Sequence, residues 1–245
     1  MNCLFLISCC KDKEPNGNQD VWDTVRRNVE NNFFRVLDNT RLDLTHFYQG
    51  LTREKTLQVY KIPPGGKQER VIEAWKTNKN ILASKTMPAI ERYCGKFYAN
   101  LDEEVRNKLL EGKLDNILIV SALFGMLKPT DKIPNYELIM KDRSPNNIAL
   151  KTYWRKVFST QRFRGFFRYI MSDFSYVYSL MGSNYIYSVK PLLQGYEAYY
   201  FHCGSGFDVL RKWAEIMNRS VREGIWDPRR IKDIADEIGC VIRVL

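Results

Sequence analysis

The sequence lacks a long apolar run, and it contains only two histidines, His46 and His202, among 245 residues. A membrane-spanning helix needs about 20 consecutive apolar residues, so the sequence predicts no membrane partner. Residues 1–10 lack the basic start and the small-residue cleavage site of a secretory signal, which predicts a cytoplasmic protein. Neither histidine has a carboxylate or a second histidine at a useful spacing, which argues against a catalytic dyad or a metal pair.

The six cysteines form no C-x-x-C pair that would indicate zinc. We therefore predict no metal and no other cofactor. Scattered cysteines in a chain without an export signal are typical of reduced thiols in a cytosol, so we expect few disulfides. The cysteines are Cys3, Cys9, Cys10, Cys94, Cys203 and Cys240.

Acidic residues are absent between residues 143 and 172, although the whole chain has 28 Asp and Glu against 38 Lys and Arg, a net charge of +10. The cations of this stretch are Arg143, Lys151, Arg155, Lys156, Arg162, Arg164 and Arg168. Its aromatic residues are Tyr153, Trp154, Phe158, Phe163, Phe166, Phe167 and Tyr169. Such a mixture favours a nucleic-acid surface with phosphate pairing and base stacking. The alternative is an ordinary solvated surface.

Strand-like and helix-like segments alternate along the chain. We expect strands at residues 3–8, 58–61, 116–125, 176–180 and 198–202, and helices at 20–37, 68–84, 88–95, 99–111, 148–158, 207–218 and 229–238. The apolar run at 116–125 shows no alternation, as expected for a strand covered on both faces. The sequence thus predicts a single α/β domain over residues 1–245, with a mostly parallel central sheet flanked by helices.

Polar segments follow three of the apolar runs, at residues 8–13, 121–136 and 182–190. In an open α/β sheet, the loops beyond the carboxyl ends of the strands form the ligand crevice, so these segments are expected to converge. A phosphate or nucleotide would suit the basic residues that such a crevice collects. These are Lys11, Lys13, Arg92, Lys96 and Lys190. The alternative is that each segment is a solvated loop.

Cys9 and Cys10 lie directly before Lys11, which suggests a second hypothesis, a catalytic thiol. Nearby cations lower the pKa of a thiol and make it a better nucleophile, so these three residues are candidates for catalysis. The alternative is that both thiols are buried as small apolar groups.

The segment from Ile90 to Leu101 places two helices around Gly95. A helix-hairpin-helix uses such a turn to offer backbone N–H groups to a DNA phosphate. A plain pair of packed helices gives the same pattern.

Two segments of the sequence resemble those of the YaaA family. Residues 93–101 (YCGKFYANL) are similar to the family's F-x-G-x-x-Y-x-x-L, and residues 120–140 (VSALFGMLKPTDKIPNYELIM) to its L-S-G-L-Y-G-x-L-R-P-L-D-x-x-x-P-Y-R-L-E-M. Looser similarity continues through Tyr153, Trp154 and residues 185–191. Two segments depart from the family: residues 8–12 lack the proline of S-P-A-K-T, and residues 201–208 lack the basic residues of F-Y-A-K-K-A-R-G.

The resemblance implies an α/β fold with a helix-hairpin-helix element and a positively charged cleft. It also implies DNA binding and a role in limiting oxidative damage by keeping free iron low during peroxide stress. By position, Gly95 and Lys96 would form the hairpin. Ser121, Gly125, Pro129, Tyr136 and Lys190 match signature positions, so Ser8, Lys11, Lys13, Ser121, Gly125, Tyr136 and Lys190 are the candidate pocket.

The leading hypothesis is a DNA-binding protein of the peroxide-stress type. The candidate contacts are Arg92, Gly95, Lys96, Arg155, Lys156, Arg162, Arg164 and Arg168. The rival is an enzyme that acts on a modified nucleobase or nucleotide. Because the resemblance extends to proteins associated with deazaguanine modification of DNA, hydration of a nitrile by Cys9 or Cys10 beside Lys11 is the example.

Overall fold

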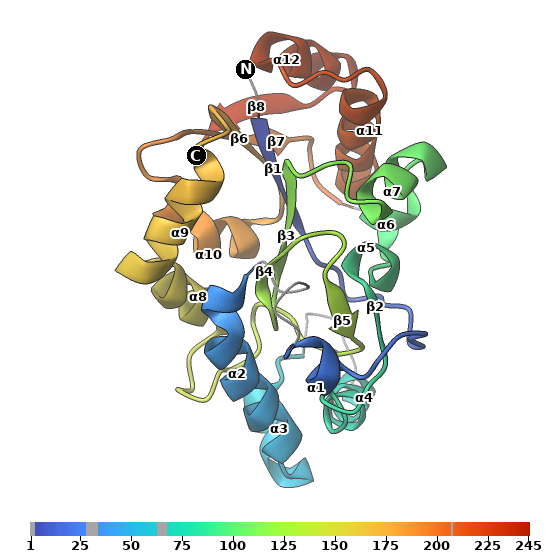
Figure 1. The fold of residues 1–245 in the computed structure, drawn as a ribbon, viewed down its shortest axis with the longest axis vertical. Coiled ribbons are helices and arrows are strands. Elements are labelled where there is room, and N and C mark those ends of the chain that lie inside the picture. Colours follow the sequence, from blue (N-terminus) through green and yellow to red (C-terminus); the bar gives the residue numbers. More distant parts are fainter. Residues whose placement is uncertain (1–2, 28–33, 63–67, 207) are drawn as a thin grey trace.

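A central sheet organises the molecule, whose computed structural model describes residues 3–27, 34–62, 68–206 and 208–245 (Figure 1). Within these residues the larger sheet has six strands in the order β4-β3-β1-β6-β7-β8. β3, β1, β6 and β7 are parallel, and the outer β4 and β8 are antiparallel to their neighbours. The strands are β1 (Cys3–Ser8), β3 (Ile117–Ser121), β4 (Gly125–Leu127), β6 (Tyr176–Leu180), β7 (Glu197–His202) and β8 (Val241–Val244).

The core of the sheet is formed by β1 and β3, which pair with Phe5 opposite Ile117. All five residues of β3 and the first five of β1 are buried. Burial of consecutive residues means that both faces of these strands are covered, which explains why their sequences are apolar without alternation. The sequence predicted this property correctly.

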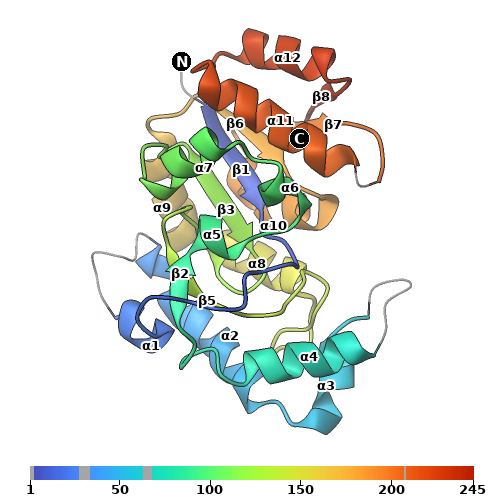
Figure 2. The same ribbon diagram turned by 90° about the vertical axis from the view of Figure 1, so that its right-hand side faces the viewer.

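Helices cover both faces of the sheet (Figures 1 and 2). One face carries α8 (Leu150–Phe158), α9 (Gln161–Met171) and α10 (Ser183–Leu193). The opposite face carries α5 (Ala89–Arg92), α6 (Lys96–Ala99), α7 (Glu103–Leu110) and α11 (Asp208–Arg222), and α12 (Pro228–Glu237) packs against α11 and β8. This arrangement confirms the predicted α/β fold with a mainly parallel sheet.

A second group of elements lies beyond one end of the sheet, the lower end in Figures 1 and 2. It contains α1 (Trp22–Val25), α2 (Asp38–Gly50), α3 (Arg53–Val59) and α4 (Glu69–Asn78), together with the 3-10 helix η2 (Arg35–Leu37). A small antiparallel sheet joins β2 (Thr86–Pro88) to β5 (Lys132–Pro134).

Several predicted elements differ from those observed. The strand expected at 58–61 is wrong, because Val59 ends α3. The segment 182–190, expected as a loop, forms most of α10. Part of the helix expected at 20–37 falls outside the described residues, and the described part contains only the short α1 and η2.

The expectation of reduced thiols is wrong at one pair, because Cys203 and Cys240 form a disulfide with an S–S distance of 2.04 Å. His202 pairs with Val241 in the antiparallel ladder between β7 and β8. The two cysteines therefore lie immediately beyond the last pair of that ladder, next to adjacent strands. β8 was not predicted, and without it nothing in the sequence brings these cysteines together.

Candidate functional site

The carboxyl ends of β1 and β6 meet where the chain changes direction across the sheet. From β1 the chain reaches β3 on one side, and it later returns to β6 on the other side. Ligands of open α/β sheets bind at such switch points. Here the Cys9 Sγ, just after β1, lies 3.2 Å from the Tyr185 hydroxyl on α10, which follows β6. The predicted convergence of strand-end segments is therefore observed at this place.

A series of hydrogen-bonded, buried hydroxyl groups lies nearby, at the end of β3. The Tyr136 hydroxyl lies 2.9 Å from the Ser121 Oγ and 2.8 Å from the Tyr93 hydroxyl. Ser121 also accepts a hydrogen bond from the Phe124 N–H. Burial raises the pKa of Tyr93 and of Tyr136 well above the ordinary value. Both phenols therefore stay protonated at neutral pH and act as neutral hydrogen-bonding groups.

Lys13 connects the buried hydroxyl groups to the surface. Its Nζ lies 4.3 Å from the centre of the Tyr136 ring and donates to the carbonyls of Cys10 and Lys11. Lys11 and Lys13 line a polar cavity of about 410 Å³ with Asn135 and Glu137. Ser8 contributes through its backbone, since its carbonyl accepts the hydroxyl of Tyr98 at 2.9 Å.

One member of the predicted pocket lies elsewhere, and another has a structural role beside it. Lys190 lines a different cavity, on α10 beside the ends of β6 and β7. Gly125 has a structural role, because its φ is +72° and a Cβ atom there would approach Trp154 Cζ3 to 2.5 Å. The structure thus brings Ser8, Lys11, Lys13, Ser121 and Tyr136 together without Lys190, and Gly125 pairs with Ser121 across the β3–β4 ladder.

The Cys10 thiol is not activated by its lysine neighbours. Burial raises its pKa to about 12, and the opposing effect of Lys13 is smaller. The thiol donates to the carbonyl of Asp12 at 2.9 Å and accepts from the Gly95 N–H at 3.3 Å. The expectation that neighbouring cations lower the pKa of this thiol is therefore wrong for Cys10.

Arg92 is another residue that the structure places differently from the prediction. Its side chain has no exposed surface, and it donates to the carbonyls of Glu14, Asn16, Lys85 and Ile133. The guanidinium therefore fastens neighbouring loops together and is not exposed to a phosphate. It does not belong to a nucleic-acid surface.

The helix-hairpin-helix element is not confirmed. α5 and α6 have four residues each and flank Cys94 and Gly95. The Gly95 N–H already donates to Cys10, and a Cβ atom on Gly95 would lie 2.8 Å from the Cys10 Cβ. Close packing against Cys10 is therefore the observed reason for glycine here. Lys96 is exposed at the start of α6.

Cations on α8 and α9 form the second candidate site. Lys156, Arg162 and Arg168 are exposed, and Arg155 and Arg164 are half-buried. We call these five residues the α8–α9 basic surface. In the part of the chain that the structure describes, none of them has a carboxylate within 4.0 Å. Arg155 lies 4.6 Å above the Tyr187 ring and donates to the Tyr187 carbonyl.

The aromatic residues of the same stretch do not present stacking surfaces. Only Tyr169 is largely exposed, at 71%, whereas four others are fully or almost fully buried. These are Trp154, Phe158, Phe163 and Phe167. Their 3.6-residue spacing turns them toward the sheet, which leaves the cations on the solvent side. The expected interleaving of stacked bases with phosphate contacts is therefore wrong.

We call the Cys9–Tyr185 contact, the hydroxyl groups of Tyr93, Ser121 and Tyr136 and the cavity lined by Lys11 and Lys13 the strand-end site. Some of its residues were not predicted. Asn135, Glu137 and Tyr185 line the cavity or contact Cys9. Burial raises the pKa of Glu137 above its ordinary value. The signal for Asn135 and Glu137 was their position beside Tyr136. Tyr185 belongs to the stretch 185–191 that resembles the family loosely, but no local pattern links it to Cys9, which is 176 residues away.

A search of the described ranges finds no group of three or more His, Cys, Asp and Glu residues that could hold a metal ion. In the same ranges, no helix has the length and apolar character to cross a membrane.

Comparison with known proteins decides the family. The sequence model of the family described as "Peroxide stress protein YaaA" matches residues 3–197. The chain belongs to this family. The YaaA match includes both candidate sites and every strand except part of β7 and all of β8. α11, α12 and β8 lie outside it.

Individual relatives match shorter stretches. A UPF0246 protein of Corynebacterium glutamicum is 35% identical over 105 residues, which are 43% of this chain and 40% of the relative. An "Uncharacterized protein" of Campylobacter jejuni is 28% identical over 132 residues, 53% of this chain and 52% of the relative. The chain thus spans about half or less of the length of these relatives.

Proposed function

We propose that this YaaA family protein binds DNA in the cytoplasm through the α8–α9 basic surface, as part of a response to peroxide. One observation carries the proposal: five cations lie on adjacent helices, and no carboxylate pairs with them in the described ranges. A cation that already forms an ion pair with a carboxylate in the folded protein gains little binding free energy from contact with a phosphate. Unpaired cations gain the full interaction and release counterions from the DNA.

The contacts differ in kind along this surface. Arg162 and Arg168 on α9 are exposed and offer whole guanidinium groups, which bind phosphate oxygens with two parallel hydrogen bonds. Arg155 is held by Tyr187, yet a guanidinium has five N–H donors, so others remain for a phosphate. Because the nearby aromatic rings are buried, binding rests on phosphates and has little base preference.

A salt titration of wild-type protein with a short mixed-sequence duplex tests the proposal. Each phosphate contact contributes about −0.9 to the slope of log K against log salt concentration. The five residues together therefore predict a slope of up to about −4.5, measured by fluorescence anisotropy. Absent binding, or an affinity that does not change between low and moderate salt, contradicts the proposal.

We propose, as a second candidate, an enzyme that acts on a modified nucleobase or nucleotide at the strand-end site. The observation in its favour is the contact between the Cys9 thiol and the Tyr185 hydroxyl at the switch point of the sheet. Lys11, on the rim of the 410 Å³ cavity, would bind an anionic part of the substrate. Nitrile hydration remains the example of a reaction that uses a thiol nucleophile.

Alkylation of the thiols tests this second candidate. Cys10 has a pKa of about 12 and is therefore protonated at neutral pH, so we expect it to label slowly with iodoacetamide. The exposed Cys94 serves as an internal reference for an accessible thiol. Labelling of Cys9 faster than Cys94 supports the enzyme, and labelling of Cys9 far slower than Cys94 counts against it.

A further inference from the structure

A second cavity, separate from the strand-end site, lies outside the carboxyl ends of β6 and β7. Its volume is about 500 Å³. The start of α10 forms one wall, with Gly182 and Ser183, and α11 contributes Trp213. Cavities of about 300–1,000 Å³ at this end of an α/β sheet are the usual size and place of small-molecule sites. The proposed DNA surface makes no use of this cavity.

The cavity has an apolar floor and a polar rim. Ile186, Phe201 and Trp213 belong to the floor, and Tyr187, Lys190 and His202 belong to the rim. In the described part of the chain, neither Lys190 nor His202 has a hydrogen-bond or ion-pair partner for its side chain. No Asp or Glu side chain is among the residues that line the cavity. Lys190 therefore offers a cation to an anionic group at the rim.

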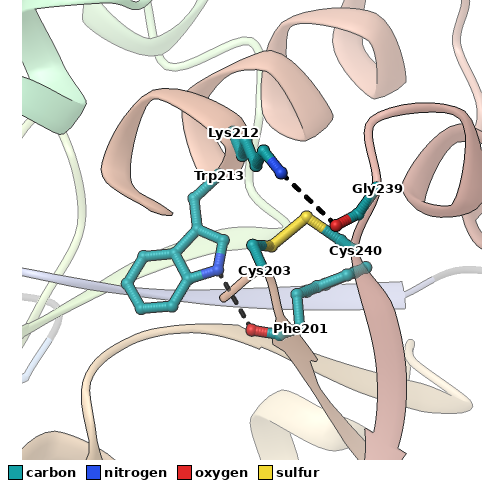
Figure 3. Close-up of a disulfide and its surroundings, with 6 residues drawn as sticks. All are labelled: Phe201, Cys203, Lys212, Trp213, Gly239 and Cys240. Carbon is teal, nitrogen blue, oxygen red and sulfur yellow. Dashed lines mark hydrogen bonds between the residues drawn. A yellow bond between two sulfur atoms is a disulfide. The ribbon is translucent and has the colours of Figure 1, made fainter. Parts of the chain in front are cut away.

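The floor of the cavity is held in place by its surroundings (Figure 3). The Trp213 Nε1–H donates to the Phe201 carbonyl at 3.2 Å. Cys203, which also lines the cavity, is bonded to Cys240, and the Lys212 Nζ donates to the Gly239 carbonyl at 3.4 Å. α11, β7 and the segment before β8 are therefore joined around the floor. A ligand would find the cavity already formed, which lowers the entropic cost of binding.

The rim of the cavity continues into the α8–α9 basic surface. Tyr187 lines the cavity, and the Arg155 guanidinium lies over its ring. Lys151 also approaches that ring, with its Nζ 5.5 Å from the ring centre. Lys190 thus lines the cavity itself, and two further cations lie against the ring of a lining residue. This is the charge pattern that complements a phosphate rather than a neutral group.

We propose that the cavity binds a nucleotide unit, with the heteroaromatic ring on the apolar floor near Trp213 and the phosphate at Lys190 and His202. Two sources have this chemistry: a free mononucleotide, and an unpaired nucleotide of a DNA strand that lies on the α8–α9 basic surface. The first source is independent of the proposed DNA binding, and the second rests on it. Stacking of a base on an aromatic side chain tolerates any base.

Calorimetric titration of the full chain with AMP and with adenosine tests the proposal. AMP should bind at least tenfold more tightly than adenosine, because only AMP reaches the rim cations. Lys190→Gln should weaken AMP binding about tenfold and leave adenosine unchanged. The matched control is Lys232→Gln, which removes a lysine already paired with Asp236 on α12 and should change neither affinity. Absent AMP binding, or equal losses in both variants, overturns the proposal.

Competition then separates the two sources. Displacement of AMP by a duplex with one unpaired nucleotide, but not by a fully paired duplex, assigns the cavity to DNA. Binding of AMP without displacement by either duplex assigns it to a free nucleotide. If duplex DNA binds in the salt titration but AMP does not bind, the cavity proposal fails while the proposed function stands. Ile186→Trp, which fills the floor, should abolish AMP binding, and circular dichroism shows whether that variant is folded.

Discussion

Tyr136 joins three parts of the chain through one hydroxyl group, which contacts Ser121 at the end of β3 and Tyr93 after α5. Replacing it with phenylalanine leaves the buried Tyr93 hydroxyl without this partner. Such a loss costs roughly 1–3 kcal/mol, so Tyr136→Phe should lower the free energy of unfolding by that amount in urea denaturation. Tyr169→Phe, at an exposed position, is the matched control and should have no effect. Equal stability of both variants would mean that the hydroxyl chain contributes nothing.

Asp131 predicts a pH dependence of stability. Burial raises the pKa of this carboxyl to about 6, from an unfolded value near 3.8. Between these values the unfolded chain releases the proton and the folded chain keeps it, so folding stability falls as pH rises from about 4 to about 6. Asp131→Asn removes the charge, and an amide oxygen can still accept the Lys128 N–H.

The variant should therefore gain stability relative to wild type as pH rises through this window, by up to about 3 kcal/mol. Urea denaturation at several pH values from 4 to 7 measures the difference between the two proteins. A constant difference across the window, or a difference that shrinks, contradicts the assignment.

Single residues also mark the limit of sequence-based prediction. Ser8, Lys11, Lys13, Ser121 and Tyr136 were placed near one another because strand ends meet at one edge of a parallel sheet. The contact of Cys9 with Tyr185 depends on the orientation of α10, and no local pattern encodes that orientation. Arg92 was assigned by charge alone, whereas its four carbonyl partners come from loops that the sequence does not bring together.

At the scale of elements, the turn between β3 and β4 fixes α8 against the sheet. The Trp154 Nε1–H donates to the Ala122 carbonyl at 2.8 Å, and the indole ring occupies the space where Gly125 lacks a side chain. Gly125→Ala combines a clash with Trp154 and an unfavourable φ of +72°, so it should destabilise the protein by about 3 kcal/mol.

Urea denaturation measures this effect, and Gly165→Ala provides the control. Gly165 lies inside α9, where an added Cβ atom meets nothing within 4 Å. Alanine there should stabilise the helix by roughly 0.5–1 kcal/mol. Destabilisation by both substitutions would show that the effect at Gly125 is not specific to its contact with Trp154.

The disulfide connects β7 to the segment between α12 and β8, and it closes a loop with a sequence separation of 37 residues. A disulfide that closes a loop of this length raises the free energy of unfolding of a protein by about 2–4 kcal/mol. A variant with Cys203→Ser and Cys240→Ser should therefore have a free energy of unfolding lower by about 2–4 kcal/mol. Its hydrogen exchange should rise first in α12 and β8. Unchanged exchange in those elements would contradict a tethering role.

Elements with strong patterns were predictable, and short ones were not. The uninterrupted apolar run gave β3, and the helix-like composition of residues 148–158 gave α8. β8 has four mostly exposed residues at the edge of the sheet, so it lacks both alternation and an apolar run. α9 was not predicted, although its N-cap Thr160 accepts a hydrogen bond from the Phe163 N–H and its apolar residues have helical spacing.

The distribution of charge over the whole molecule carries the functional conclusion. Several cations on α7, α11 and α12 have acidic partners, as in the pairs Lys108–Glu104, Arg211–Asp208 and Lys232–Asp236. The α8–α9 basic surface, within the described ranges, has none. Excess charge is therefore concentrated on one side of the sheet, where a polyanion relieves the repulsion between the cations.

The central claim is that this unpaired charge binds DNA, and the most direct measurement compares two triple variants. One carries Arg162→Gln, Arg164→Gln and Arg168→Gln, and the other carries Lys108→Gln, Arg211→Gln and Lys232→Gln, so both lose three positive charges. If the α8–α9 basic surface contacts phosphates, the slope of log K against log salt should become shallower by about 3 in the first variant and stay unchanged in the second. Equal changes in both variants would contradict the account, since binding would then follow net charge and not this surface.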